Sequence, residues 1–170
     1  MQVETGYAEA IARKYPESVA IAIAKDAQGK HNPISLGWVM CTSHQPPMLA
    51  ISVGLTRYSL EAIRRAKEFV VAFPSSAMAE DALYFGTKSG RDGDKLAARK
   101  TPTQPARTID SVLLADAVAN FECVLEGEMR TGDHVIFAGR VTAAHVNEDP
   151  AVRRLYTTGK GYAMGGVVPG

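Results

Sequence analysis

The chain has little of several features that mark large classes of protein. It holds two cysteines in 170 residues, Cys41 and Cys123, and they lack the spacing of a metal-binding or redox motif. Its 19 lysines and arginines nearly balance its 18 aspartates and glutamates, so no overall field favours nucleic acid or an anionic membrane. No apolar run approaches the roughly 20 residues that a membrane-spanning helix needs. We therefore expect no nucleic-acid or membrane partner, and any preference for anions must come from local groups.

The sequence also lacks a recognisable signal peptide, so we expect a cytoplasmic protein whose two thiols stay reduced. Its length suits one domain, residues 1–170, which can bury roughly two-thirds of its unfolded surface around a single core.

What the chain does contain is mostly the pattern of β-strands. Strands are predicted at 18–25, 33–43, 48–55, 69–73, 118–130 and 134–146. Helices are predicted at 5–15, 59–67 and 75–86, with single helical turns at 95–99 and 149–156. Residues 87–108 predict a long loop, and the glycine-rich segment 159–170 is expected to be mostly irregular. Because strands and helices do not alternate regularly, the pattern favours a closed, mostly antiparallel barrel with helices on its outside.

A few residues indicate how individual elements are built. In 18–25, valine and isoleucine alternate with alanine, which predicts a strand with one fully buried face. Ser59 is expected to cap the helix that follows it, with Glu61 in the first turn. Gly132 can supply the positive φ of a tight hairpin between the last two long strands.

Three segments carry a resemblance to a known family. They are NPISLGWVMCTSHQPPMLAISVGLTRYS at 32–59, GTKSGRDGDKL at 86–96 and GDHVIFAGRV at 132–141. Together they resemble the flavin reductase-like family, the FMN-binding split barrels that include flavoredoxins and the reductase partners of two-component monooxygenases. The resemblance implies a mainly β chain with some α-helix, folded as an antiparallel FMN-binding split β-barrel with flanking helices. It also implies flavin dependence, with FMN expected and FAD possible, and a homodimer.

A flavin phosphate is best bound by a helix N-terminus together with a cation. The predicted contacts before the helix at 59–67 are Thr56, Arg57, Tyr58 and Ser59, which offer amides, hydroxyls and a guanidinium. Alternatively, this is an ordinary capped helix with a solvent-exposed arginine.

The loop after residue 86 offers a second set of contacts. Gly90 allows a close approach of the backbone to a ligand, and Lys95 can serve as a point charge. The predicted phosphate or ribityl contacts are Ser89, Gly90, Arg91 and Lys95. Alternatively these are solvated loop charges, and for Arg91 neither interpretation is favoured.

The flavin ring is expected along the strand that begins at the only tryptophan. The predicted ring contacts there are Trp38, Val39, Met40, Cys41, Thr42 and Ser43, with Asn32 and Ser52 as further candidates. Peptide N–H groups and hydroxyls can address the polar edge of the ring, and Cys41 is assigned backbone contact only. Alternatively, Trp38 is a large core residue.

His134 is the predicted catalytic residue. Its position after a Gly-Asp pair resembles the family position beside the flavin, where it could orient the nicotinamide donor or hold a proton near the reduced ring. Alternatively, it is a histidine at the start of a strand that only satisfies the turn. The other histidines lack partners at metal-ligand spacing, so no metal site is predicted.

No dinucleotide fingerprint lies in a strand-to-helix turn, so a nicotinamide donor would have to stack directly on the flavin. The leading hypothesis is an NAD(P)H-dependent flavin oxidoreductase that passes electrons to free flavin, a ferric complex or a partner monooxygenase. The alternatives are a flavoredoxin-type electron carrier that takes its electrons from a redox protein, and a non-catalytic flavin-binding protein.

Overall fold

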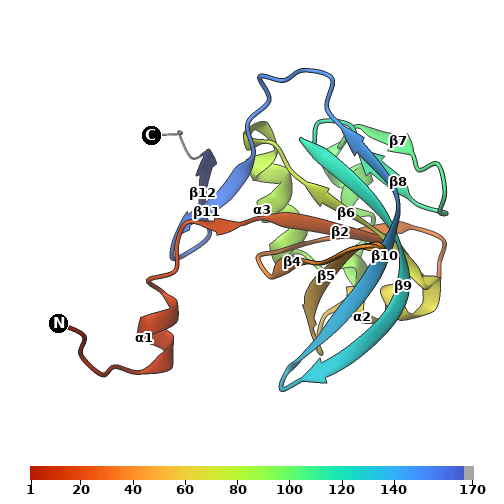
Figure 1. Ribbon diagram of the computed structural model, residues 1–170. Coiled ribbons are helices and arrows are strands. Elements are labelled where there is room, and N and C mark those ends of the chain that lie inside the picture. The colour runs from red at the N-terminus through yellow and green to blue at the C-terminus, as the bar shows by residue number, and fades with distance from the viewer. Residues whose placement is uncertain (167–170) are drawn as a thin grey trace.

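The computed structural model describes residues 1–166 and is organised around one seven-stranded antiparallel sheet (Figure 1). Its strands are β2 Ala20–Lys25, β3 His31–Leu36, β4 Val39–His44, β5 Pro47–Gly54, β6 Glu68–Phe73, β9 Ala119–Thr131 and β10 His134–Val146. They are hydrogen-bonded in the order β3-β2-β6-β9-β10-β5-β4. The two edge strands, β3 and β4, are joined by residues 37–38 alone, so the edges of the sheet must meet at that point. The sheet therefore curls into a split barrel whose ladder of hydrogen bonds is not closed.

The remaining elements flank this sheet. The helices are α1 Tyr7–Ile11, α2 Tyr58–Ala66, η1 Ser76–Met78, α3 Ala79–Thr87, η2 Gly90–Asp92 and α4 Lys95–Arg99. The additional strands are β1 Glu17–Ser18, β7 Thr103–Pro105, β8 Val112–Leu114, β11 Leu155–Gly159 and β12 Ala163–Gly166. Strands β1, β11 and β12 form a small sheet that lies with α1 to one side of the barrel (Figure 1). Among the described residues, no helix is both long and apolar enough to cross a membrane.

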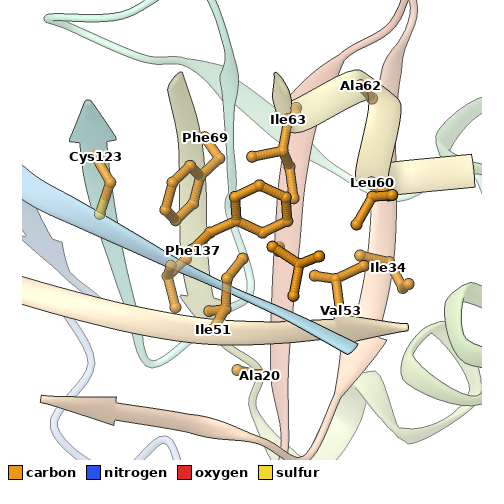
Figure 2. Close-up of a cluster of buried hydrophobic side chains, with 14 of the residues drawn as sticks. Ala20, Ile34, Ile51, Val53, Leu60, Ala62, Ile63, Phe69, Cys123 and Phe137 are labelled. Carbon is orange, nitrogen blue, oxygen red and sulfur yellow. The ribbon is translucent and has the colours of Figure 1, made fainter. Parts of the chain in front are cut away.

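The inside of the barrel is one of two hydrophobic clusters. Figure 2 shows Phe69, Phe137 and Ile51 from the strands lying together with Ile63 of α2, so this helix closes the interior. Burial of these large side chains removes apolar surface from water and stabilises the curled sheet. Gly139 lies against Phe69, because a Cβ at this position would come within 2.6 Å of the ring.

The second cluster covers the outer face of the same strands. Ile21 and Ile23 of β2 point into it, and Ala82 and Phe85 of α3 cover them, together with the segment 109–117. The alanines of β2 belong to the interior cluster, so this strand is buried on both faces. The sequence pattern predicts only one fully buried face, because alanine has a small side chain and marks a core position less clearly than valine or isoleucine.

Several predicted boundaries need correction. The strand predicted at 33–43 is interrupted at residues 37–38 and forms the two edge strands. Ser59 does not cap α2, because Arg57 is the N-cap residue and the helix begins at Tyr58. The first helix spans only Tyr7–Ile11, since residues 12–13 form a turn after it.

The C-terminal part is more ordered than predicted. The helical turn predicted at 149–156 is wrong: residues 150–151 form a single turn, closed by a bond from the Val152 amide to the Asp149 carbonyl, and Leu155 begins β11. Strands β11 and β12 form a hairpin in the segment expected to be irregular, with positive φ at Gly161 and Tyr162. The last part of that segment, 167–170, lies outside the described residues. The helical turn at 95–99 and the hairpin with positive φ at Gly132 are confirmed.

Candidate functional site

Two adjoining pockets lie between the start of α2, the end of α3 and the edge strand β3. The larger has a volume of about 600 Å³ and the smaller about 150 Å³. Ile34, Arg57, Gly86 and Thr87 line both pockets, so the two are continuous. The larger volume falls within the range of about 300–1,000 Å³ that is typical of small-molecule sites. A ligand with a bulky part and a compact part would fit the pair.

The smaller pocket, which we call the cation pocket, is lined by charges of one sign. Its positively charged residues are Arg57, Lys88, Arg91 and Lys95. Its hydroxyl-bearing residues are Thr56, Tyr58, Ser59, Thr87 and Ser89. Within the described part of the chain, no carboxylate lines this pocket. Like charges gathered without a counter-charge repel one another, so this arrangement favours a bound anion.

The N-terminus of α2 faces the same pocket. Its N-cap residue, Arg57, makes no side-chain capping bond, so the first amides of this nine-residue helix have no side-chain acceptor. The partial positive charge of the helix terminus adds to that of the side chains. Ser59 is buried and its Oγ accepts a hydrogen bond of 2.8 Å from Asn32 Nδ2, which leaves the hydroxyl proton free to donate.

Lys95 is the most unusual residue of the cation pocket. Its side chain is buried, with the residue only 5% exposed, and Nζ donates to the carbonyl oxygens of Phe85 and Lys88 at 3.2 and 3.3 Å. It forms no ion pair within residues 1–166. Burial and the nearby charge of Arg57 lower the pKa of Lys95 to about 8. An anion in the pocket would offset both effects.

The short helix η2 is held against the start of α2. A Cβ on Gly90 would come within 2.1 Å of Asn32 Oδ1 and 2.8 Å of the Tyr58 ring, so only glycine fits there. The Arg91 guanidinium lies 5.2 Å from the centroid of the Tyr58 ring, a cation–π contact. Ser89 Oγ accepts a hydrogen bond from the Arg91 amide. These contacts fix the loop that carries the lysines and Arg91.

Tyr58 is in turn fixed by the turn at 26–30. Its hydroxyl donates to Gln28 Oε1 at 2.7 Å and contacts Asp26 Oδ2 at 3.1 Å. Burial and the interaction with the Asp26 carboxylate raise the pKa of Tyr58, so the phenol stays protonated.

The larger pocket, which we call the ring pocket, contains Trp38 and His134 on one side. Their rings are 4.7 Å apart between centroids, and Lys14 Nζ lies 5.6 Å from the Trp38 ring. His134 Nδ1 is 2.6 Å from Asp133 Oδ1, and this contact lowers the pKa of Asp133. The carboxylate therefore fixes the orientation of the imidazole.

The structure gathers many of the predicted residues but not all of them. Thr56, Arg57, Tyr58, Ser59, Ser89, Gly90, Arg91 and Lys95 line the cation pocket. Trp38, Ser52 and His134 line the ring pocket. Asn32 lines neither pocket but bonds to Ser59. Val39, Met40, Cys41, Thr42 and Ser43 lie on β4 and line neither pocket, so their contact with a flavin remains a prediction.

Some lining residues were missed. In the ring pocket they include Tyr15 and Glu17 near the N-terminus and Tyr162 and Met164 in the C-terminal hairpin. Nothing local in the sequence places these two ends of the chain together. Gly86 and Thr87 could have been found, because they begin the segment 86–96 that carries part of the resemblance.

Comparison with known proteins agrees with this geometry. The model of the flavin reductase like domain matches residues 12–165. NADH-dependent FMN reductase AsuE2 of Streptomyces nodosus subsp. asukaensis is 31% identical over 148 residues, which cover 84% of this chain and 78% of that protein. An uncharacterized protein of Archaeoglobus fulgidus is 30% identical over 124 residues, covering 73% and 69%. Flavoredoxin from Methanosarcina acetivorans has the same fold, with a TM-score of 0.87 at 23% identity over 100% of this chain and 93% of that one. Because this family model matches almost the whole chain, the chain belongs to the flavin reductase-like family.

Proposed function

We propose that this protein is an NAD(P)H-dependent flavin oxidoreductase that binds a flavin by its phosphate. In this proposal the nucleotide reduces the bound flavin, and the electrons pass to free flavin, a ferric complex or a partner monooxygenase. The observation that carries the proposal is the cation pocket with no carboxylate in its described lining, opening directly into the ring pocket. The relative AsuE2, whose name states an NADH-dependent FMN reductase, supports the same class of donor.

The residues present fit FMN. The phosphate would lie at the start of α2, where Arg57 and Lys95 supply charge and Ser59 supplies a hydroxyl. The ring would occupy the ring pocket beside Trp38 and His134. When bound, the flavin supplies the redox chemistry, accepting a hydride from the nicotinamide and releasing the electrons to the acceptor.

His134 would act on the donor or on a proton beside the ring. Asp133 holds Nδ1, which leaves Nε2 as the ring nitrogen available to a ligand. In this position it can orient the carboxamide of the nicotinamide by a hydrogen bond.

The donor would share the ring pocket with the flavin. The pocket of about 600 Å³ has one wall in the barrel and another in the two ends of the chain, at Tyr15, Glu17, Tyr162 and Met164. Stacking of the nicotinamide on the flavin in this space would need no separate nucleotide-binding domain, in line with the lack of a dinucleotide fingerprint.

A homodimer is part of the proposal. Trp38 and Met40 are 46% and 53% exposed where β4 begins, and Tyr7 on the projecting helix α1 is 76% exposed (Figure 1). Apolar residues exposed beside a candidate site are typical of subunit interfaces. Light scattering should return twice the mass of one chain, and the mass of a single chain would contradict this part of the proposal.

The function is tested by an absorbance spectrum of the protein after incubation with FMN and desalting, followed by anaerobic titration with NADH and then NADPH. We expect flavin bands in the visible region that bleach with at least one nucleotide. A colourless protein would overturn flavin binding. Bound flavin that neither nucleotide reduces would overturn the reductase activity and favour the electron carrier.

A further inference from the structure

Lys95 has the features of a nucleophilic amine, which the proposed function uses only as a charge. A lysine becomes a nucleophile near neutral pH when burial or a neighbouring cation favours its uncharged form. Both conditions apply here, because burial and the charge of Arg57 lower the pKa of Lys95 to about 8. At pH 8 about half of this side chain is a free amine, whereas a lysine with the ordinary pKa of 10.5 is less than about 1% uncharged.

Two carbonyl oxygens hold the Lys95 amine in a fixed position. Nζ donates to the carbonyl oxygens of Phe85 and Lys88 at 3.2 and 3.3 Å. A neutral amine has two N–H donors and one lone pair. When both donors bond to these carbonyls, the lone pair stays available to a group in the pockets that Lys95 lines.

Lys95 lies at the boundary between the cation pocket and a third pocket of about 390 Å³. The third pocket shares Lys88, Ser89 and Lys95 with the cation pocket, so a ligand can extend from one into the other. The carboxylates that line the third pocket, Asp92 and Asp94, form no ion pair with Lys95. A compound that joins a phosphate to an electrophilic carbon would therefore place that carbon beside Nζ.

We propose that Lys95 is acylated by acyl phosphates that bind in the cation pocket, and that acylation prevents flavin binding. An acyl phosphate fits because its reactive carbonyl carbon is joined to the phosphate through a single oxygen. The phosphate would occupy the cation pocket and the acyl group the space toward the third pocket. The effect on flavin binding rests on the proposed function, because it needs the flavin phosphate at the same place.

The reaction needs no partner beyond the acyl phosphate. The lone pair of Nζ attacks the acyl carbon and forms an amide bond, while the bond from that carbon to the phosphate oxygen breaks. Inorganic phosphate leaves with the bonding electron pair, and Nζ gives one proton to solvent. Arg57 and the start of α2 stabilise the charge of the departing phosphate.

Acylation would change the cation pocket in two ways. The amide is neutral, so the buried charge that attracts a phosphate is lost. The added acyl group also takes up space in a pocket of about 150 Å³. Bound FMN would in turn cover Nζ, so only the flavin-free protein should react.

Acetyl phosphate is the probe for the modified residue. Flavin-free protein is incubated with it at pH 8, and peptide mass spectrometry follows acetylation of each lysine with time. Lys95 should react about tenfold faster than Lys88, which lines the same pocket but is exposed, and than Lys30, which lies in an exposed turn outside the pockets. Saturating inorganic phosphate or FMN should protect Lys95 and leave Lys30 unaffected.

A reagent without a phosphate tests recognition. With N-acetylimidazole, the ratio of the Lys95 rate to the Lys30 rate should fall at least about fivefold, because nothing draws this reagent into the cation pocket. An unchanged ratio would mean that the phosphate plays no part, and the proposal would be overturned.

Lys95→Arg is the matched variant for the effect on flavin. Arginine keeps the positive charge and cannot be acetylated under these conditions. After treatment with acetyl phosphate, the FMN dissociation constant of the unaltered protein should rise about 100-fold, the loss of one charged contact. That of Lys95→Arg should be the same before and after treatment. The peptide measurement needs no variant, so it identifies the site even if Lys95→Arg does not fold.

The outcomes separate this proposal from the proposed function. If Lys88 or Lys30 reacts as fast as Lys95, the acylation site is overturned, whatever the protein does with flavin. Full acetylation of Lys95 with unchanged FMN affinity would overturn its effect on flavin. If Lys95 is acetylated selectively in a protein that binds no flavin, the proposed function fails and the acylation site stands.

Discussion

The cation pocket and the ring pocket are built in different ways. The cation pocket comes from two short stretches of chain, 56–59 and 85–95, apart from Ile34, and its side chains are fixed by Asn32 and Asp26 from outside. The ring pocket draws on six separate regions, including both ends of the chain, and its tryptophan is 46% exposed. The cation pocket is therefore a local anchor with fixed side chains. The ring pocket is an open surface made of segments that lie far apart in the sequence.

This difference suits the two tasks that the proposed function requires. An anchor must hold one chemical group, and fixed groups lose little entropy when they bind. The reacting face must admit donor and acceptor in turn, which requires access rather than closure. Changes in the anchor should therefore alter flavin affinity, whereas changes in the ring pocket should alter turnover.

The largest effect is expected from Lys95→Met. Methionine keeps the apolar stem but removes the buried charge, so the FMN dissociation constant should rise about 100-fold, the loss of one charged contact with the phosphate. The melting temperature of the flavin-free protein should not fall, because an unpaired buried cation is costly. Lys30→Met, in an exposed turn outside both pockets, is the control. An unchanged FMN affinity would show that Lys95 is not part of the anchor.

Gly90→Ala should weaken FMN about tenfold. The new Cβ would lie 2.1 Å from Asn32 Oδ1, so η2 must shift and carry Arg91 with it. Riboflavin, which has no phosphate, should bind both forms equally. Gly127→Ala is the matched control, since a Cβ there meets nothing within 4 Å. A parallel loss of riboflavin affinity would mean that the change disturbs the ring pocket as well, and the comparison of the two pockets would not hold.

The pH dependence of FMN binding should reflect Lys95. The pKa of this lysine is lowered to about 8, and a bound phosphate favours its charged form, so affinity should be constant just below pH 8 and fall above it. The free energy of unfolding of the flavin-free protein should change in the opposite direction to the FMN affinity. The unfolded chain holds the proton up to its ordinary pKa near 10.5, so the flavin-free protein should gain stability between about pH 8 and 10.5.

Lys95→Met separates this group from all others that titrate in the same range. Titration calorimetry and thermal melts at several pH values should show both trends in the unaltered protein and neither in the variant. If the variant keeps the same pH dependence of affinity, another group is responsible.

The residues of the anchor could be predicted because they are local. Arg57 and Ser59 lie at the start of one helix, and Gly90 and Lys95 occur within six residues of each other, so short motifs carry most of the cation pocket. The error at Ser59 has a physical cause. A serine before a helix usually caps it, but here Asn32 donates to its hydroxyl and the helix starts one residue earlier.

The ring pocket could be predicted only in part. Trp38 and His134 were identified, and the structure places their rings 4.7 Å apart. Tyr15 and Tyr162 were missed because they are brought there by pairing of β1 with β11 and of β11 with β12. Such pairing between the two ends of a chain leaves no local pattern, and the glycines at 159–166 indicated only irregular structure.

Trp38→Ala should have the smallest effect on FMN affinity, and it tests the role of the ring pocket. Because the side chain is 46% exposed and contacts mainly His134 and Lys14, its removal should raise the FMN dissociation constant less than about threefold. It should, however, free the imidazole to move and lower kcat/KM for the nicotinamide donor by about tenfold, a loss of orientation rather than of binding. Trp38→Phe should restore most of that loss, because a ring again packs against His134. A change of more than tenfold in FMN affinity, with unchanged turnover, would mean that the ring pocket also anchors the flavin. The separation of affinity in the cation pocket from turnover in the ring pocket would then not hold.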